Sequence, residues 1–208
     1  MKMSSFAFFA SYGIREILFK HHKPILGTII LTDKCNLHCK HCAVNNINGV
    51  IYSYEQILGE MHMLYDQGIR ILFFCGGETF LWEDQGKTVR DLVIEARKIG
   101  FLIINLVTNG TFKIDVPEVD LILVSIDGDR ERHNSIRGDV FDSIMENVKN
   151  ATKDNIIFYM AVNQLNKNVI RKVGEIVMQQ ENVRAVSFNF HTPYVGTEAL
   201  SLPSVCSC

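Results

Sequence analysis

The stretch Leu31-Thr-Asp-Lys-Cys-Asn-Leu-His-Cys-Lys-His-Cys-Ala43 places three cysteines within eight residues. Cys35, Cys39 and Cys42 form a C-x3-C-x2-C spacing directly after an apolar run, Ile25–Leu31, that predicts a strand. Thiolates are soft ligands, so three of them in one loop favour zinc, Cu(I) or an iron–sulfur cluster over magnesium or calcium. Iron–sulfur clusters are usually held by four cysteines. A four-iron cluster held by these three alone would keep one iron open, as reactive metal sites do.

Length and composition indicate one ordinary globular domain. The chain has 208 residues, of which 47% are hydrophobic and 21% charged, which is typical of a soluble protein with a single core. The formal net charge is −2 and no long basic run occurs, so we expect no nucleic-acid partner. There are six cysteines, but three have a metal-like spacing. A reducing, cytoplasmic location therefore fits better than a disulfide framework.

Apolar runs of strand length recur, and most are continuous, as expected for parallel strands covered on both faces. These runs are Ile25–Leu31, Ile69–Cys75, Phe101–Val107, Leu121–Ile126, Ile156–Val162 and Arg184–Phe190. Helical patterns lie between them: a segment opened by the Ser53 capping box and stopped by Gly68, Lys87–Ile99, a segment after Asp139, and Lys167–Met178. The alternation predicts an α/β fold with βα units around a parallel sheet. Only the third connection, Thr108–Asp120, is too short for a helix, so we expect a loop there.

Polar motifs follow every predicted strand. In chain order they are the cysteine loop, Gly76-Gly77-Glu78, Thr108-Asn109-Gly110, Ser125-Ile126-Asp127-Gly128, Asn163 and His191. In a barrel-like α/β fold the carboxyl ends of the strands meet at one face, and active sites lie there. The sequence therefore predicts one site built from six strand ends.

The cysteine loop and these motifs together resemble the radical S-adenosylmethionine (radical SAM) enzyme superfamily, from about Thr28 to His191. The resemblance implies a partial TIM-like (β/α)6 barrel and a [4Fe-4S] cluster on Cys35, Cys39 and Cys42. It implies that S-adenosylmethionine chelates the open iron and is cleaved reductively. The resulting 5′-deoxyadenosyl radical then takes a hydrogen atom from a substrate that the sequence does not identify. An electron donor of the flavodoxin or ferredoxin type is also implied.

The resemblance assigns roles to four groups of residues. Gly76, Gly77 and Glu78 resemble the glycine-rich motif for the methionine moiety, although Thr79 stands where the family usually has proline. Glycines let a backbone approach a ligand closely, and Glu78 can accept a hydrogen bond from an ammonium group.

Ser125 and Asp127 resemble the positions that bind the ribose hydroxyls; an Asp-Gly turn is the alternative for Asp127. Arg137 resembles an arginine that pairs with the methionine carboxylate, a task that suits a guanidinium fork. A solvated surface arginine is the alternative. His41 occupies the position of an aromatic residue near the adenine.

Two other classes of site compete with this interpretation. His38 or His41 could complete a Cys3His structural zinc site, or the chain could be a non-catalytic iron–sulfur protein. A structural zinc site leaves the strand-end motifs without a purpose. Cys75 ends a strand and is interpreted as a small buried hydrophobe. Cys206 and Cys208 are too few to hold an auxiliary cluster.

We expect three segments: an amphipathic extension over 1–24, a radical SAM core over 25–203, and a short irregular tail over 204–208. In the extension, Phe6, Phe9, Tyr12, Ile17 and Phe19 are expected to cover an open base or edge of the domain. The alternative is peripheral membrane contact, supported by Lys20, His21, His22 and Lys23.

Only Thr192–Cys208 follows the sixth strand, so we expect a core truncated there, or a tail unlike that of the family. The last strand would then have poorly covered apolar surface. The sequence does not identify the substrate. The aromatic start suggests a lipid-like substrate, and a peptide is the alternative; fold and cofactor do not decide between the two.

Overall fold

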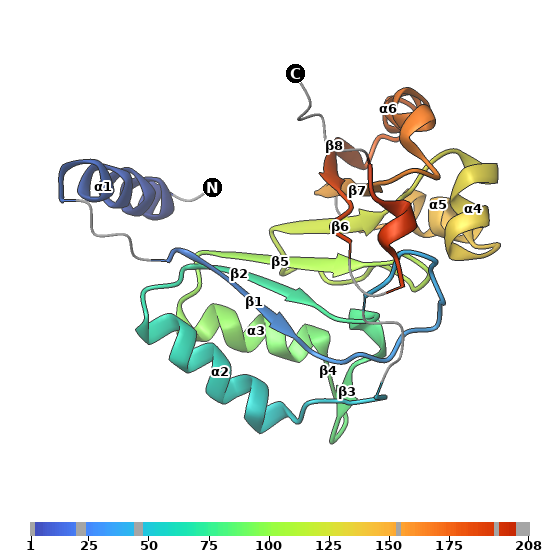
Figure 1. Ribbon diagram of the computed structural model, residues 1–208. Coiled ribbons are helices and arrows are strands. Elements are labelled where there is room, and N and C mark those ends of the chain that lie inside the picture. The colour runs from blue at the N-terminus through green and yellow to red at the C-terminus, as the bar shows by residue number, and fades with distance from the viewer. Residues whose placement is uncertain (1–2, 20–23, 44–47, 153–154, 194–195, 203–208) are drawn as a thin grey trace.

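A six-stranded parallel sheet forms the centre of the protein, as the computed structural model shows for residues 3–19, 24–43, 48–152, 155–193 and 196–202 (Figure 1). Its strands lie in chain order: β1 Leu26–Ile30, β2 Ile71–Cys75, β5 Ile103–Thr108, β6 Leu121–Ser125, β7 Ile156–Val162 and β8 Val183–Phe190. All five neighbouring pairs are parallel. β1 and β8 are the two edges of the sheet. This is the predicted partial (β/α)6 barrel.

Helices connect most of the strands. The connecting helices are α2 Tyr54–Asp66, α3 Val89–Ile99, α4 Arg130–Arg137, α5 Phe141–Lys149 and α6 Ile170–Val177, with short 3-10 turns η1 Thr79–Leu81 and η2 Lys167–Val169. Helix α1 Met3–Phe19 precedes the sheet, and the 3-10 turn η3 Glu198–Leu200 follows it. The capping box at Ser53 opens α2 as expected, because Ser53 accepts from the Gln56 N–H while the Gln56 side chain accepts from the Ser53 N–H. The connection from β5 to β6 has no helix, as predicted.

The core lies between the sheet and the helices packed on one of its faces. Leu72, Phe74, Ile104 and Leu106 point to this face and are completely buried. Burying one such side chain contributes about 1.5–3 kcal/mol. On β1 the opposite face is more open, because Leu26 and Ile30 are each 50% exposed. Side chains alternate along a strand, so the helix-free face is the concave side of the partial barrel.

Two predicted helices begin later than expected, and one helix was not predicted. Lys87–Thr88 forms strand β4, which pairs with β3 (Glu83–Asp84), so α3 starts at Val89. The turn between them has positive φ at Gln85 and Gly86, as a tight two-residue hairpin requires. Lys167–Val169 is a 3-10 turn before α6. The unpredicted helix is α4, which is capped by the Asp129 carboxylate through the Arg132 N–H.

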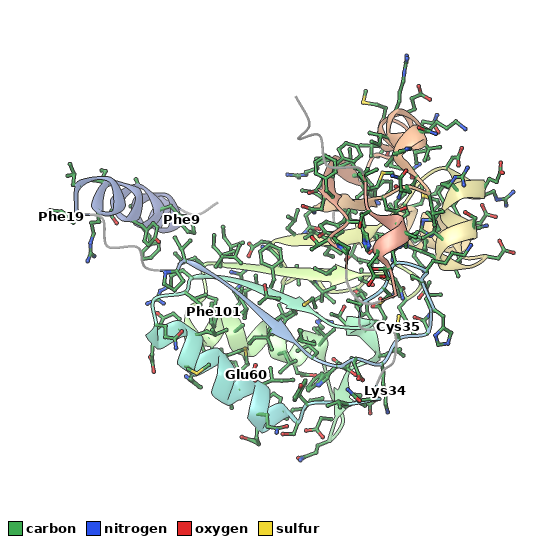
Figure 2. The ribbon with its side chains drawn as sticks, in the orientation of Figure 1. Phe9, Phe19, Lys34, Cys35, Glu60 and Phe101 are labelled. Atoms are coloured by element: carbon green, nitrogen blue, oxygen red, sulfur yellow. The ribbon has the colours of Figure 1, made fainter. Side chains whose placement is uncertain are left out.

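Helix α1 lies within the predicted extension and projects beyond the start of β1 (Figure 1). Phe19 is 65% exposed and lies at the opposite end of the view from Cys35 (Figure 2). The expectation that the Phe19 side chain covers an edge of the domain is therefore wrong. The Phe8 ring lies 6.0 Å from the Arg70 guanidinium carbon. The side chains of Phe6 and Ile17, residues 20–23 and the 204–208 tail lie outside the described residues. None of the described helices has the length and apolarity to cross a bilayer.

The last strand carries exposed apolar side chains, as expected. Phe188 is 41% exposed and Phe190 is 76% exposed. Both alternate with Ser187 and Asn189 and therefore share the face of β8 that continues the buried face of β7.

Candidate cluster and cofactor site

The cysteine loop is attached to the loop after β2 by backbone hydrogen bonds. The Gly77 N–H donates to the Thr32 carbonyl at 2.7 Å, and the Glu78 N–H donates to the Lys34 carbonyl at 2.8 Å. At the base of the loop the Leu31 N–H donates to the Cys75 carbonyl at 2.8 Å. The pairing of β1 with β2 thus continues past the ends of both strands and fixes where the three cysteines begin.

Glycine is required at 76 and 77 by this contact. A Cβ atom on Gly76 would lie 2.5 Å from the Thr32 carbonyl oxygen, and one on Gly77 would lie 2.2 Å from the Lys34 carbonyl oxygen. Both distances are far inside van der Waals contact with rigid backbone. We expected these glycines to let backbone approach a ligand. In the structure they let the loop after β2 approach the cysteine loop.

Glu78 connects the loop after β2 to the end of β5. Its carboxylate accepts from the Thr108 hydroxyl at 2.7 Å, the Asn109 N–H at 2.6 Å and the Phe80 N–H at 3.1 Å. The residue is completely buried. Burial raises the pKa of Glu78, and the hydrogen bonds only partly oppose this. With these donors in place, Glu78 acts as a brace between two strand ends.

Asn109 extends this set of hydrogen bonds to the first cysteine, Cys35. Its Nδ2 lies 3.6 Å from the Cys35 sulfur and 2.8 Å from Asn36 Oδ1. Its Oδ1 accepts from the Thr111 N–H at 2.9 Å and the Thr111 hydroxyl at 2.7 Å. The amide is thereby fixed in orientation, with an N–H directed at the sulfur.

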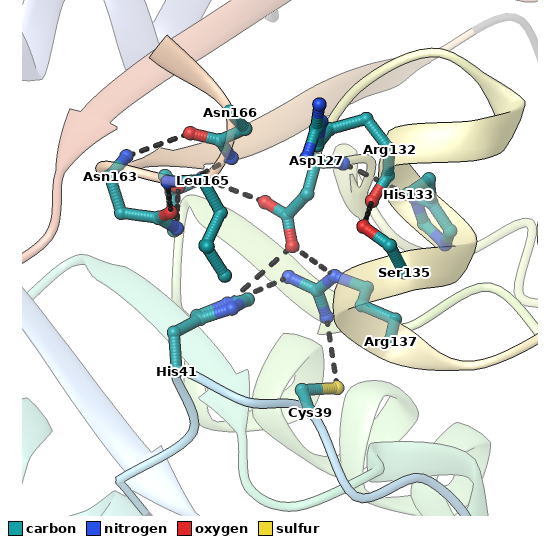
Figure 3. Close-up of polar contacts among 11 residues, drawn as sticks. Cys39, His41, Asp127, Arg132, His133, Ser135, Arg137, Asn163, Leu165 and Asn166 are labelled. Carbon is teal, nitrogen blue, oxygen red and sulfur yellow. Dashed lines mark hydrogen bonds and ion pairs between the residues drawn. The ribbon is translucent and has the colours of Figure 1, made fainter. Parts of the chain in front are cut away.

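A buried ion pair lies beside the second cysteine (Figure 3). The Arg137 Nε–H donates to Oδ2 of Asp127, and the Ala161 N–H donates to Oδ1 of Asp127 at 3.1 Å. The side chain of Asp127 is 0% exposed and that of Arg137 is 9% exposed. Burial alone would raise the pKa of Asp127, but the charge of Arg137, its hydrogen bond and the nearby His41 together outweigh burial, so the pKa is lowered. Asp127 is therefore an anion paired with a cation.

Arg137 extends from this pair to the cysteine loop. Its Nη1 lies 3.8 Å from the Cys39 sulfur, and its Nη2 lies 3.4 Å from His41 Nε2. His41 Nε2 is also 3.5 Å from Asp127 Oδ2, so its partner depends on the tautomer. Burial raises the pKa of the Cys39 thiol to about 11, and the nearby Arg137 acts in the opposite direction. Cluster binding must therefore displace the proton of Cys39.

His133 supports the same pair from α4. Its Nδ1 accepts from the Asp127 N–H at 3.2 Å, and its ring packs edge-on against Phe141. The side chain is completely buried. Burial, and to a smaller extent the Arg137 charge, lowers the pKa of His133 to about 4. His133 is thus a neutral imidazole that positions the backbone of Asp127.

The remaining predicted residues differ in what they offer. Ser125 is 7% exposed on the concave side of β6, and its hydroxyl makes no hydrogen bond within the described chain. Asn163 is buried in a turn in which its Oδ1 accepts from the Leu165 N–H at 2.8 Å. His191 packs edge-on against His41 with ring centroids 6.3 Å apart. The first, fourth and sixth strand ends therefore converge, as the motif order predicted.

The cysteine loop offers thiol ligands that both zinc and an iron–sulfur cluster accept. Within the described ranges no three His, Cys, Asp or Glu side chains converge closely enough to hold one metal ion. A tetrahedral zinc site needs its sulfurs about 3.8 Å apart, from Zn–S bonds of about 2.3 Å. A cubane cluster is larger and separates its ligands further. The thiols of Cys35, Cys39 and Cys42 supply three of the soft ligands that such a cluster takes.

Sequence reasoning missed the way these residues pair. Asp127 and Arg137 were both assigned to S-adenosylmethionine, yet each is the main partner of the other. Asn109 belonged to a recognised motif without a role, and His133 was not singled out. The sequence carries no signal for this pairing, because the ten residues between Asp127 and Arg137 do not determine whether the two side chains meet.

The model of the radical SAM superfamily matches residues 29–175. The chain belongs to the radical SAM superfamily. Members of this superfamily use a [4Fe-4S] cluster and S-adenosylmethionine. The match covers the cysteine loop and all strand ends up to β7.

Similar radical SAM proteins include two curated relatives. The sporulation killing factor maturation protein SkfB of Bacillus subtilis is 31% identical over 181 residues, which cover 79% of this chain and 42% of SkfB. The Fe-coproporphyrin III synthase of Methanosarcina barkeri is 26% identical over 85% of this chain and 46% of that protein. The chain thus spans less than half the length of these radical SAM relatives.

A solved structure with the same radical SAM core is that of Streptococcus suis SuiB bound to S-adenosylmethionine. It superposes with a TM-score of 0.70 at 12% identity, over 97% of this chain and 49% of SuiB. At this identity the likeness shows the fold alone.

Proposed function

We propose that the chain is the core of a radical SAM enzyme in which Cys35, Cys39 and Cys42 hold a [4Fe-4S] cluster. The observation that supports this most directly is the docking of the cysteine loop on the loop after β2, through backbone hydrogen bonds from Gly77 and Glu78. When bound, the cluster supplies the electron that cleaves S-adenosylmethionine. The protein's share is to hold the loop, position the cofactor and exclude water.

The cofactor contacts are divided between strand ends. Ser125 offers a hydroxyl on the concave face for the ribose, and His41 lies beside the cysteine loop for the adenine. Gly76 and Gly77 bring the loop after β2 against the cysteine loop, where the methionine moiety must lie if it chelates the open iron. The carboxylates of Glu78 and Asp127 accept hydrogen bonds from protein donors. These two residues therefore position their neighbours in the site and do not contact the cofactor directly.

We further propose a peptide substrate. Support comes from the names of relatives: SkfB is a maturation protein for the sporulation killing factor, and SuiB was solved bound to the precursor peptide SuiA. The open concave face of β1, with Leu26 and Ile30 half exposed, suits an extended apolar chain. A lipid-like substrate is the alternative outcome. A flavodoxin- or ferredoxin-type donor and a cytoplasmic location complete the proposal, since the cluster needs reduction and protection from oxidants.

The test is an anaerobic turnover assay on the full chain. Reconstituted protein is reduced with dithionite in the presence of S-adenosylmethionine, and 5′-deoxyadenosine is measured by liquid chromatography. We expect product from the wild type and none from Cys39→Ala. Cys75→Ala serves as the control for cluster content, because Cys75 lies outside the cysteine loop and should leave iron per chain unchanged. Zinc without sulfide in the wild type would overturn the proposal.

A further inference from the structure

We propose that Asn109 and Arg137 are positioning residues that donate hydrogen bonds to the sulfurs of Cys35 and Cys39 and so raise the reduction potential of the cluster. This inference rests on the proposed function and goes beyond it. It concerns how readily the cluster accepts an electron before S-adenosylmethionine or a substrate is bound.

Arg137 is the stronger of the two donors. Its Nη1 is 3.8 Å from the Cys39 sulfur, within the range for a hydrogen bond to sulfur. The side chain is 9% exposed, so its positive charge acts in a medium of low dielectric constant. The buried Asp127 carboxylate fixes the opposite edge of the guanidinium. The guanidinium therefore cannot swing away from the sulfur without breaking a buried ion pair.

Asn109 repeats this arrangement at Cys35. Its Nδ2 is 3.6 Å from the sulfur, its Oδ1 is held by Thr111, and its backbone N–H is held by the buried Glu78 carboxylate. At both cysteines a donor from outside the cysteine loop reaches the sulfur, and a buried carboxylate holds that donor. Glu78 and Asn109 follow the ends of β2 and β5. Asp127 follows the end of β6, and Arg137 lies in α4.

The expected effect follows from charge. Reduction adds one electron to a cluster that already carries thiolates, and hydrogen bonds or positive charge near the sulfurs stabilise the reduced form. Removing a donor should therefore lower the potential. The change should be larger for Arg137, which brings a full charge, than for Asn109, which brings only a dipole.

The experiment is a redox titration of the reconstituted full chain without S-adenosylmethionine, followed by absorbance and electron paramagnetic resonance. At a fixed ambient potential we expect the ratio of reduced to oxidised cluster to fall about tenfold in Arg137→Gln, which is about 59 mV for a one-electron couple. In Asn109→Leu, which removes the amide, this ratio should fall less. In Arg137→Lys the ratio should lie between those of Arg137→Gln and the wild type. Arg90→Gln removes a charge from an exposed pair with Glu118 and should leave the ratio unchanged.

Resonance Raman spectra give a second readout that a merely structural role would not move. Loss of an N–H···S bond should raise the Fe–S(Cys) stretching frequencies. If Arg137→Gln takes up no cluster, Arg137→Lys and Asn109→Leu decide the question by the same two measurements. Unchanged potentials and frequencies in cluster-loaded variants would overturn the inference, including the case in which only S-adenosylmethionine affinity falls. Absence of a cluster in the wild type would instead overturn the proposed function.

Discussion

The Nε–H of Arg137 donates to Oδ2 of Asp127 where the carboxylate is completely buried and only 9% of the arginine side chain is exposed. Taking two charges out of water costs several kcal/mol per ion, and their attraction repays this only when the geometry is good. The Ala161 N–H on the second carboxylate oxygen supplies part of that geometry. The pair therefore links β6, β7 and α4 at the point where the Cys39 sulfur must be placed.

Asp127→Asn should destabilise the protein strongly, because it leaves the Arg137 charge buried without its partner. Breaking a buried pair from one side costs about 3–5 kcal/mol. Urea denaturation of the cluster-free protein measures the loss. The double variant Asp127→Asn/Arg137→Met should lose less than the single one, since no lone charge remains.

The matched control for this prediction is Asp142→Asn. Asp142 pairs with Arg130 on the surface, where both side chains are more than 60% exposed, and such pairs contribute about 0–1 kcal/mol. If Asp127→Asn costs no more than Asp142→Asn, the Asp127–Arg137 pair does not anchor the site.

Gly77→Ala should prevent the cysteine loop from docking. The added methyl group would lie 2.2 Å from the Lys34 carbonyl oxygen, so one of the two backbones must shift. We expect iron per chain after anaerobic reconstitution to fall several-fold. Gly59→Ala is the control, because a Cβ at Gly59 meets nothing within 4 Å and alanine favours a helix by about 1 kcal/mol. Full iron loading in Gly77→Ala would show that the loop tolerates the shift.

Most of the fold could be predicted from the sequence, because its strands are continuous apolar runs bounded by turn residues. All six predicted strands are present in the predicted order. The helix α4 was missed because its residues are strongly polar and lack an apolar stripe. The β3–β4 hairpin was missed because Gln85 adopts positive φ, which is uncommon for a residue other than glycine.

The placement of the site could also be predicted, since the carboxyl ends of parallel strands meet. The partners within the site could not. Sequence pattern assigned Glu78, Asp127 and Arg137 to ligand contacts one at a time. Which charge pairs with which depends on distances across different elements, and a ten-residue separation such as that of Asp127 and Arg137 does not determine this.

Glu78→Gln distinguishes a brace from a ligand contact. A glutamine would direct an NH2 group toward the donors of Thr108 or Asn109, and each buried donor left unsatisfied costs about 1–3 kcal/mol. We expect a loss of stability of that size in thermal or urea unfolding, measured without S-adenosylmethionine. Unchanged stability combined with weaker S-adenosylmethionine binding would instead support direct contact with the methionine ammonium group.

His133 should make the protein less stable as the pH falls. Its pKa is lowered from 6.5 to about 4 by burial, although Asp127 acts in the opposite direction and Arg137 and His41 act in the same one. Between these two values the unfolded chain binds a proton that the folded chain excludes, so the free energy of unfolding decreases with falling pH. This lowering of the His133 pKa corresponds to at most about 3 kcal/mol of the free energy of unfolding.

His133→Asn tests this assignment, because an amide oxygen can accept from the Asp127 N–H but does not titrate. Urea unfolding of both proteins between pH 7 and pH 4 gives the two profiles. The variant should be less stable at pH 7, where it loses the packing of the imidazole against Phe141, and its profile should be flatter. Parallel profiles would mean that His133 already binds its proton in the folded protein near pH 6.5, which its complete burial argues against.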